Sequence, residues 1–270
     1  MTRNEARADN NLPPIEGGDE LIVPLNVVTG GQASPTDTHN PNLSNAEVQS
    51  KSAEIRIKGI ATEEESKSLE EIISKFIKRQ KNAILPRLGA GAEDWWDIDR
   101  WNSELADDLE PIFNDIADAH GIEASDIIGN KYDSEITRAY LRKMAEGRAD
   151  ATNVKTKRDL DASIEADEDV ADTFDKRESK STMLGQSLAT AVAGWSVLEA
   201  CRQAEYNGFE GNIQKVWVTG ANPRPSHAAM NGERVDYDKP FSNGADWPGD
   251  DVLSPDESCG CNCSVEVIIS

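Results

Sequence analysis

The chain has 270 residues, with 50 Asp or Glu and 28 Lys or Arg, so its formal net charge is 28 − 50 = −22. Such an acidic chain lacks the basic surface that binds nucleic acid, and no apolar run approaches the roughly 20 residues that cross a bilayer. Only 37% of the residues are hydrophobic, so we expect part of the chain to be solvated.

Residues 1–58 predict a flexible, disordered leader, because Asn, Pro, Gly, Thr and Ser dominate them. The first residues lack the apolar core of a signal peptide, and we expect synthesis in the cytosol. An apolar patch, Leu21–Val28, interrupts the leader. Pro24 excludes a central strand, which leaves an edge strand, an extended segment or a peptide that docks on a partner.

Residues 59–208 predict a helical body. Thr62 with Glu65 three residues later forms a capping-box pattern, and apolar residues then follow helical spacing until Pro86 and the following glycines end the helix. A second helical segment is expected over 93–121, with Trp95, Trp96 and Trp101 near its start. Pro111 should kink or divide this second helix, and Gly121 should end it, with His120 at the helix end.

The rest of the body predicts helices over 133–147 and 154–167, a solvated acidic surface over 165–178, and a long helix over 179–208. The small residues of the long helix suit close packing. Cys201 on this helix is expected to be a buried small hydrophobe.

Residues 209–270 predict a small strand-and-turn module. Alternation over 215–220, 234–237 and 264–269 indicates three strands, separated by turns rich in Gly, Pro, Asn and Asp. The expected fold class is therefore α+β: a leader at 1–58, a helical body at 59–208 and this module.

The module also contains a possible metal-binding set: His227, Cys259, Cys261 and Cys263. Three cysteines and one histidine are a suitable zinc shell. Their Cys-x-Cys spacing is not the usual Cys-x-x-Cys knuckle, although alternate residues of a strand share a face. We therefore favour thiols that bind no metal and are either packed or exposed, with His227 hydrogen-bonded to a turn, and a zinc site is the alternative. A Cys–His nucleophile would also need an orienting group, and the sequence identifies none.

The order of residues in this module resembles the C-terminal half of the phage Mu F-like minor head proteins, the phage head morphogenesis family. The resemblance covers roughly residues 130–268 and includes an Arg-x-x-His turn. It departs from the family at the close, where Gly-Cys-Asn-Cys stands in place of Asn-Cys-Arg-Cys and Cys259 is an extra thiol. The residues that carry it are Trp217, Thr219, Arg224, His227, Gly232, Cys261 and Cys263. In addition, residues 17–31 resemble the C-terminal end of a phage portal protein.

The resemblance implies a structural protein of the virion head interior, present in the host cytoplasm during assembly. It implies partners among portal, capsid and scaffold proteins, and a role in head morphogenesis, DNA packaging or ejection. We expect no enzymatic activity, no membrane association and no direct contact with nucleic acid. The alternative is a zinc-binding or Cys/His-dependent enzymatic module.

Overall fold

The computed structural model describes residues 54–258 and 260–270. It has an α+β layout, as predicted from the sequence. The leader through residue 53, with its apolar patch and portal-like segment, lies outside the described residues, and so does Cys259. The elements in chain order are β1 (Ile55–Gly59), α2 (Glu63–Gly89), α3 (Ile98–Ile128), the 3₁₀ helix η3 (Glu135–Thr137), α4 (Arg138–Glu165), α5 (Val170–Glu178), α6 (Ser181–Tyr206), β2 (Ile213–Val218), α7 (Pro225–Ala228), β3 (Arg234–Asp236), α8 (Pro255–Ser258) and β4 (Ser264–Ile269).

The sheet is antiparallel, with strand order β1-β4-β2-β3. Strands β2, β3 and β4 are the three that alternation predicts. Strand β1 corrects the expected leader, which ends before Ile55 and not at residue 58. In β1, Ile55 pairs with Ile269 and Gly59 with Val265. Its short apolar pattern is stabilised by a partner at the far end of the sequence, which local periodicity cannot show.

Helix α2 begins at the predicted capping box. The Glu65 backbone N–H donates to Thr62 Oγ1 at 3.2 Å, and the Thr62 N–H donates to a Glu65 carboxylate oxygen at 2.7 Å. Helix α3 contains Pro111, which was expected to kink or divide it, and is not divided there. It departs from the prediction at its end, which is at Gly129, whose φ is +83°, and not at Gly121.

Gly121 has a packing role inside α3. A Cβ atom at this position would lie 2.3 Å from the ring of Tyr132, so only glycine lets the ring approach the helix. His120 is consequently a buried residue of the helix interior, and its Nε2 lies 3.1 Å from Oε2 of Glu65. The expectation of a histidine at a helix end is therefore wrong.

Helix α4 replaces the two shorter helices expected over 133–147 and 154–167. Its middle is held by polar side chains, which an apolar pattern does not reveal. Asn153 is fully buried; it accepts from Gln80 of α2 at 2.8 Å and donates to Asn102 of α3 at 2.9 Å. These bonds satisfy buried amides that would otherwise be costly to desolvate.

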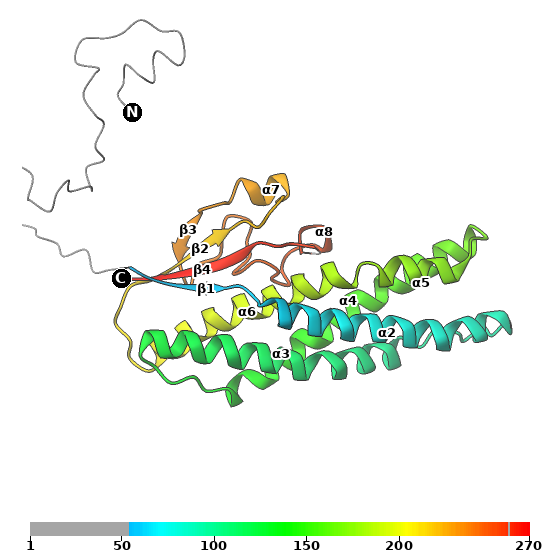
Figure 1. The fold of residues 1–270 in the computed structure, drawn as a ribbon, viewed down its shortest axis with the longest axis horizontal. Helices are drawn as coiled ribbons and strands as arrows, with labels where there is room; N and C mark the ends of the chain where they lie inside the picture. Colours follow the sequence, from blue (N-terminus) through cyan, green and yellow to red (C-terminus); the bar gives the residue numbers. More distant parts are fainter. Residues whose placement is uncertain (1–53, 259) are drawn as a thin grey trace, which may run out of the picture. The chain divides into compact units, whose positions relative to one another are not determined.

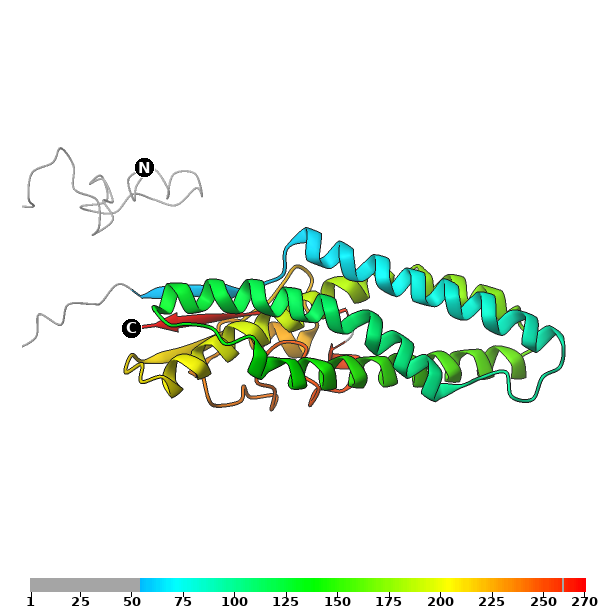
Figure 2. The ribbon, with the colours of Figure 1, turned by 90° about the horizontal axis from the view of Figure 1, so that it is seen from below.

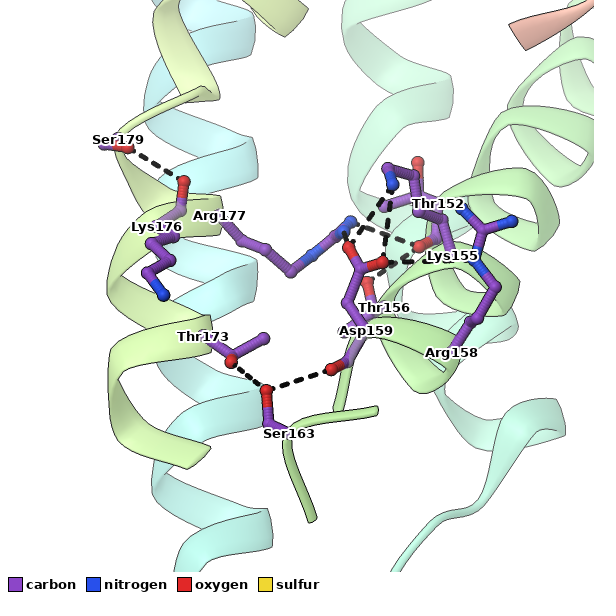
Figure 3. A network of polar contacts seen from close by, with 10 residues as sticks. All are labelled: Thr152, Lys155, Thr156, Arg158, Asp159, Ser163, Thr173, Lys176, Arg177 and Ser179. Atoms are coloured by element: carbon purple, nitrogen blue, oxygen red, sulfur yellow. Dashed lines mark hydrogen bonds and ion pairs between the residues drawn. The ribbon is translucent and has the colours of Figure 1, made fainter. Parts of the chain in front are cut away.

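Helix α5 lies in the acidic run expected to be a solvated surface, yet it buries Phe174 completely. Figure 3 shows the polar contacts between α5 and α4. Arg177 donates to Asp159 at 3.0 Å and to the Thr152 carbonyl at 3.2 Å, and the Ser163 and Thr173 hydroxyls lie 2.6 Å apart. The acidic run is thus a helix anchored on one face.

Helix α6 connects the helical layer with the sheet. It contacts α2 and α3 as well as β1 and β4, and Figures 1 and 2 show the long helices α2, α3, α4 and α6 together on one side of the sheet. The contact with β1 needs glycine, because a Cβ on Gly59 would lie 2.6 Å from the Gly194 Cα. Cys201, expected to be a buried hydrophobe, is fully buried on α6, and burial raises the pKa of its thiol to about 12.

The helices and the sheet belong to one compact unit. The expected boundary between residues 208 and 209 falls in the connection from α6 to β2, within this unit. No helix in the described part of the chain combines the length and apolarity that a bilayer crossing requires.

Candidate functional site

The candidate site lies where β2 ends and β4 begins, beside α7 and α8 (Figure 1). The chain leaves β2 at Thr219 and returns at Gly232. Asn231 closes this turn, since its side-chain oxygen accepts from the Thr219 backbone N–H at 3.1 Å and from the Thr219 hydroxyl at 3.0 Å. The Gly232 N–H donates to the Trp217 carbonyl at 2.8 Å, and its φ of +82° is one that glycine adopts without strain.

Helix α7 presents His227 to the two cysteines that precede β4. The His227 side chain is buried, and its Nδ1 lies 3.4 Å from Cys261 Sγ and 3.5 Å from Cys263 Sγ. Between the two buried cysteines, Asn262 is exposed. Both sulfurs therefore lie on one face of the segment, because alternate residues of an extended chain share a face.

Glu257 of α8 lies on the opposite side of the imidazole. One of its carboxylate oxygens is 2.9 Å from His227 Nε2, within ion-pair distance although not aligned as a hydrogen bond. The Ser226 hydroxyl donates to the same oxygen at 2.9 Å, and an Arg224 guanidinium nitrogen donates to the Glu257 carbonyl at 2.9 Å. A carboxylate beside Nε2 favours the proton on that nitrogen, which leaves the Nδ1 lone pair facing the sulfurs.

The two thiols have opposite electrostatic environments. The pKa of Cys263 is lowered, first because Cys261 donates a hydrogen bond to its sulfur and further by the Gly220 N–H, against the opposing effect of burial. The pKa of Cys261 is raised for the corresponding reason, with burial adding to the effect. The pair therefore favours one thiolate, on Cys263, with the proton held on Cys261.

Aromatic rings close the site on the sheet side. The Trp217 ring meets His227 edge to face with centroids 5.2 Å apart, and it meets Phe241 in the same way at 5.3 Å. Together with the burial of the imidazole and both thiols, this wall keeps bulk water away. A sulfur nucleophile needs access to its substrate, so the arrangement suits ligation or packing better than catalysis.

The seven residues that carry the family resemblance all lie at this end of the sheet, around α7 and the start of β4. Of the four proposed metal ligands, His227, Cys261 and Cys263 come together, whereas Cys259 is outside the described residues. Sequence reasoning missed Glu257. Its only signal was its position two residues before Cys259, which is weak in a chain with 50 acidic residues.

Comparison with known proteins adds no relative to this description: no family model, curated protein or solved structure matches the chain.

Proposed function

We propose that the chain is a phage minor head protein of the Mu F-like type, which assembles with portal and capsid or scaffold proteins during head morphogenesis. The observation that carries the proposal is the convergence of the signature residues on one site. There Trp217 packs on His227, and His227 lies beside Cys261 and Cys263, although up to 46 positions separate these residues in sequence (263 − 217). A motif whose parts converge in space is stronger support for a resemblance than their order alone.

The proposal gives the chain a structural and not a catalytic role. Its support is the burial of the imidazole and both thiols, which keeps the nucleophilic groups away from a substrate. The charge of −22 supports partners that are proteins, because it repels a phosphate backbone. Location in the virion head interior, and in the host cytoplasm during assembly, belongs to the same proposal.

The test follows the full chain through particle assembly. In cells producing a phage that encodes it, the tagged chain should co-sediment with proheads and with portal protein on a density gradient. Deleting its gene should give defective heads, and supplying the intact chain in trans should restore infectious particles. The proposal is wrong if the chain stays at the top of the gradient, separate from proheads and portal protein, and if deletion of its gene leaves particles normal.

The second candidate, a module that depends on its His/Cys cluster, is favoured by the distances from Nδ1 to the two sulfurs. Burial argues against the enzymatic form of this candidate. The metal-binding form is compatible with a head protein and is developed below.

A further inference from the structure

We propose that His227 Nδ1 and the sulfurs of Cys261 and Cys263 bind a zinc ion, which fastens α7 to the segment that enters β4. These three ligand atoms all lie within 4.8 Å of one another, and all three residues are buried. This inference is independent of the assembly role proposed above, since it concerns what holds this end of the sheet together.

The two nitrogen–sulfur distances match those of a tetrahedral zinc shell. Zinc binds thiolate sulfur at about 2.3 Å and imidazole nitrogen at about 2.05 Å, which at a tetrahedral angle separates the nitrogen and the sulfur by about 3.6 Å. The corresponding separations here are 3.4 Å to Cys261 Sγ and 3.5 Å to Cys263 Sγ. The imidazole nitrogen is therefore placed, relative to each sulfur, as a shared zinc ion requires.

The far side of the imidazole has the partner that a zinc-binding histidine usually has. Such a histidine commonly directs its other ring nitrogen at a carboxylate, which sets the tautomer and the ring orientation. Glu257 occupies this position at 2.9 Å from Nε2, and Ser226 in turn holds the same carboxylate oxygen. Glu257 is thus a positioning residue, on the wrong side of the ring to be a ligand.

The chemistry of the ligands selects the metal. Two thiolates and one imidazole favour zinc and other soft or borderline ions over Mg²⁺ and Ca²⁺, which take oxygen ligands. Three side chains leave one tetrahedral position for water or a further ligand.

The ion would stabilise a part of the chain that has little regular structure. Between β2 and β4 the described elements are the four residues of α7, three of β3 and four of α8. His227 lies 34 positions before Cys261 and 36 before Cys263 in sequence. One ion would therefore link the two ends of most of the segment between β2 and β4. Because a preformed site does not exist in the unfolded chain, zinc binding contributes directly to folding.

Metal analysis of the full chain, purified under reducing conditions, is the first test. We expect about one zinc per chain by elemental analysis. After zinc is exchanged for Co²⁺, the absorption spectrum should show sulfur-to-cobalt charge transfer and the visible bands of a tetrahedral ion. The cobalt spectrum reports thiolate ligation in the wild-type protein, so it does not depend on whether a variant folds.

The variants are paired with controls from the same chain. Cys261→Ser, Cys263→Ser and His227→Gln should each lose the zinc. The controls Cys201→Ala and His120→Gln should retain it, because these buried residues lie on α6 and α3 and are not part of the cluster. Glu257→Gln should keep one zinc per chain but weaken its affinity about 10- to 100-fold.

Three results would overturn the proposal. The first is reduced protein that takes up no zinc in a direct titration. The second is a cobalt spectrum without thiolate charge transfer. The third is a Cys261–Cys263 disulfide, identified by mass spectrometry, whose reduction creates no zinc site. None of these results bears on co-sedimentation with proheads, so the two proposals can fail separately.

Discussion

The helical layer and the turn-rich end of the sheet each bury a histidine beside a glutamate. His120 lies 3.1 Å from Glu65 on α2, and His227 lies 2.9 Å from Glu257 on α8. His120 joins two long helices that already share a large apolar core. His227 joins elements of only four residues and has two sulfurs at its other nitrogen. The comparison shows that a carboxylate beside a buried histidine does not by itself indicate a metal site. The groups that face the other ring nitrogen distinguish His227 from His120.

The largest effect should come from removing a large core side chain in either region. Trp217→Ala and Phe113→Ala each delete a fully buried ring, and each should lower the free energy of unfolding by about 4 kcal/mol. Only Trp217→Ala should also weaken binding of the proposed zinc ion, because its ring packs on His227. Urea unfolding and metal content of the folded protein measure the two effects. If folded Phe113→Ala loses as much zinc as Trp217→Ala does, metal binding is not confined to the turn-rich end of the sheet.

A smaller effect should follow from breaking the buried ion pair at the sheet end. Lys215 is fully buried, with its Nζ 3.0 Å from Asp246, whose side chain is half exposed. Asp246→Asn leaves the buried ammonium without its counterion and should cost about 2 kcal/mol near neutral pH. Burial lowers the pKa of Lys215 from its usual 10.5, so the folded state loses this proton at a lower pH than the unfolded state does.

Stability should consequently depend on pH in a defined direction. The contribution of Lys215 to the free energy of unfolding rises with pH, from its lowered folded pKa up to 10.5, and is lost as pH falls through the folded pKa. The deficit of Asp246→Asn relative to wild type should therefore shrink at alkaline pH. Urea unfolding across an alkaline pH series measures this, and Lys215→Met in the same series is the control without the titrating group. A deficit that does not change with pH would contradict this account.

The smallest effect should come from the joint between the two regions. Gly59→Ala places a Cβ against the α6 backbone at Gly194 and should cost about 1.5 kcal/mol. Gly147→Ala is the matched control in α4, where an added Cβ meets nothing within 4 Å; it should stabilise the protein by about 0.5–1 kcal/mol. Thermal unfolding distinguishes the two variants. Equal melting temperatures for Gly59→Ala and Gly147→Ala would show that the packing of β1 on α6 does not require this close approach.

The features that could be predicted from the sequence are those that depend on residues close together in the chain. The capping box at Thr62, the helix over 181–206 and the three C-terminal strands depend on neighbours in sequence, and all were found. Strand β1 was missed because its partner β4 lies about 210 positions away. The continuity of α4 was missed because Asn153, a buried polar residue, carries contacts that an apolar pattern omits.

The candidate site was predicted only in part, because some of its geometry depends on residues that are distant in sequence. Alternation along Cys261 and Cys263 places both sulfurs on one face, which is local information. Their distance to His227 depends on the turn that Asn231 closes and on the β2–β4 pairing, neither of which spacing reveals. Glu257 could not be singled out among so many acids, because only its contact with the imidazole distinguishes it.

The position of β4 has a consequence for synthesis on the ribosome. β4 is the last described strand to be made, yet it lies between β1, the first, and β2. While the nascent chain lacks β4, β1 lacks the strand with which it pairs in the described part of the chain, and the face of α6 that receives the sheet is incomplete. The two cysteines immediately before β4 emerge just ahead of it, so an ion bound there would fix the start of this strand at the time when β4 first pairs with β1.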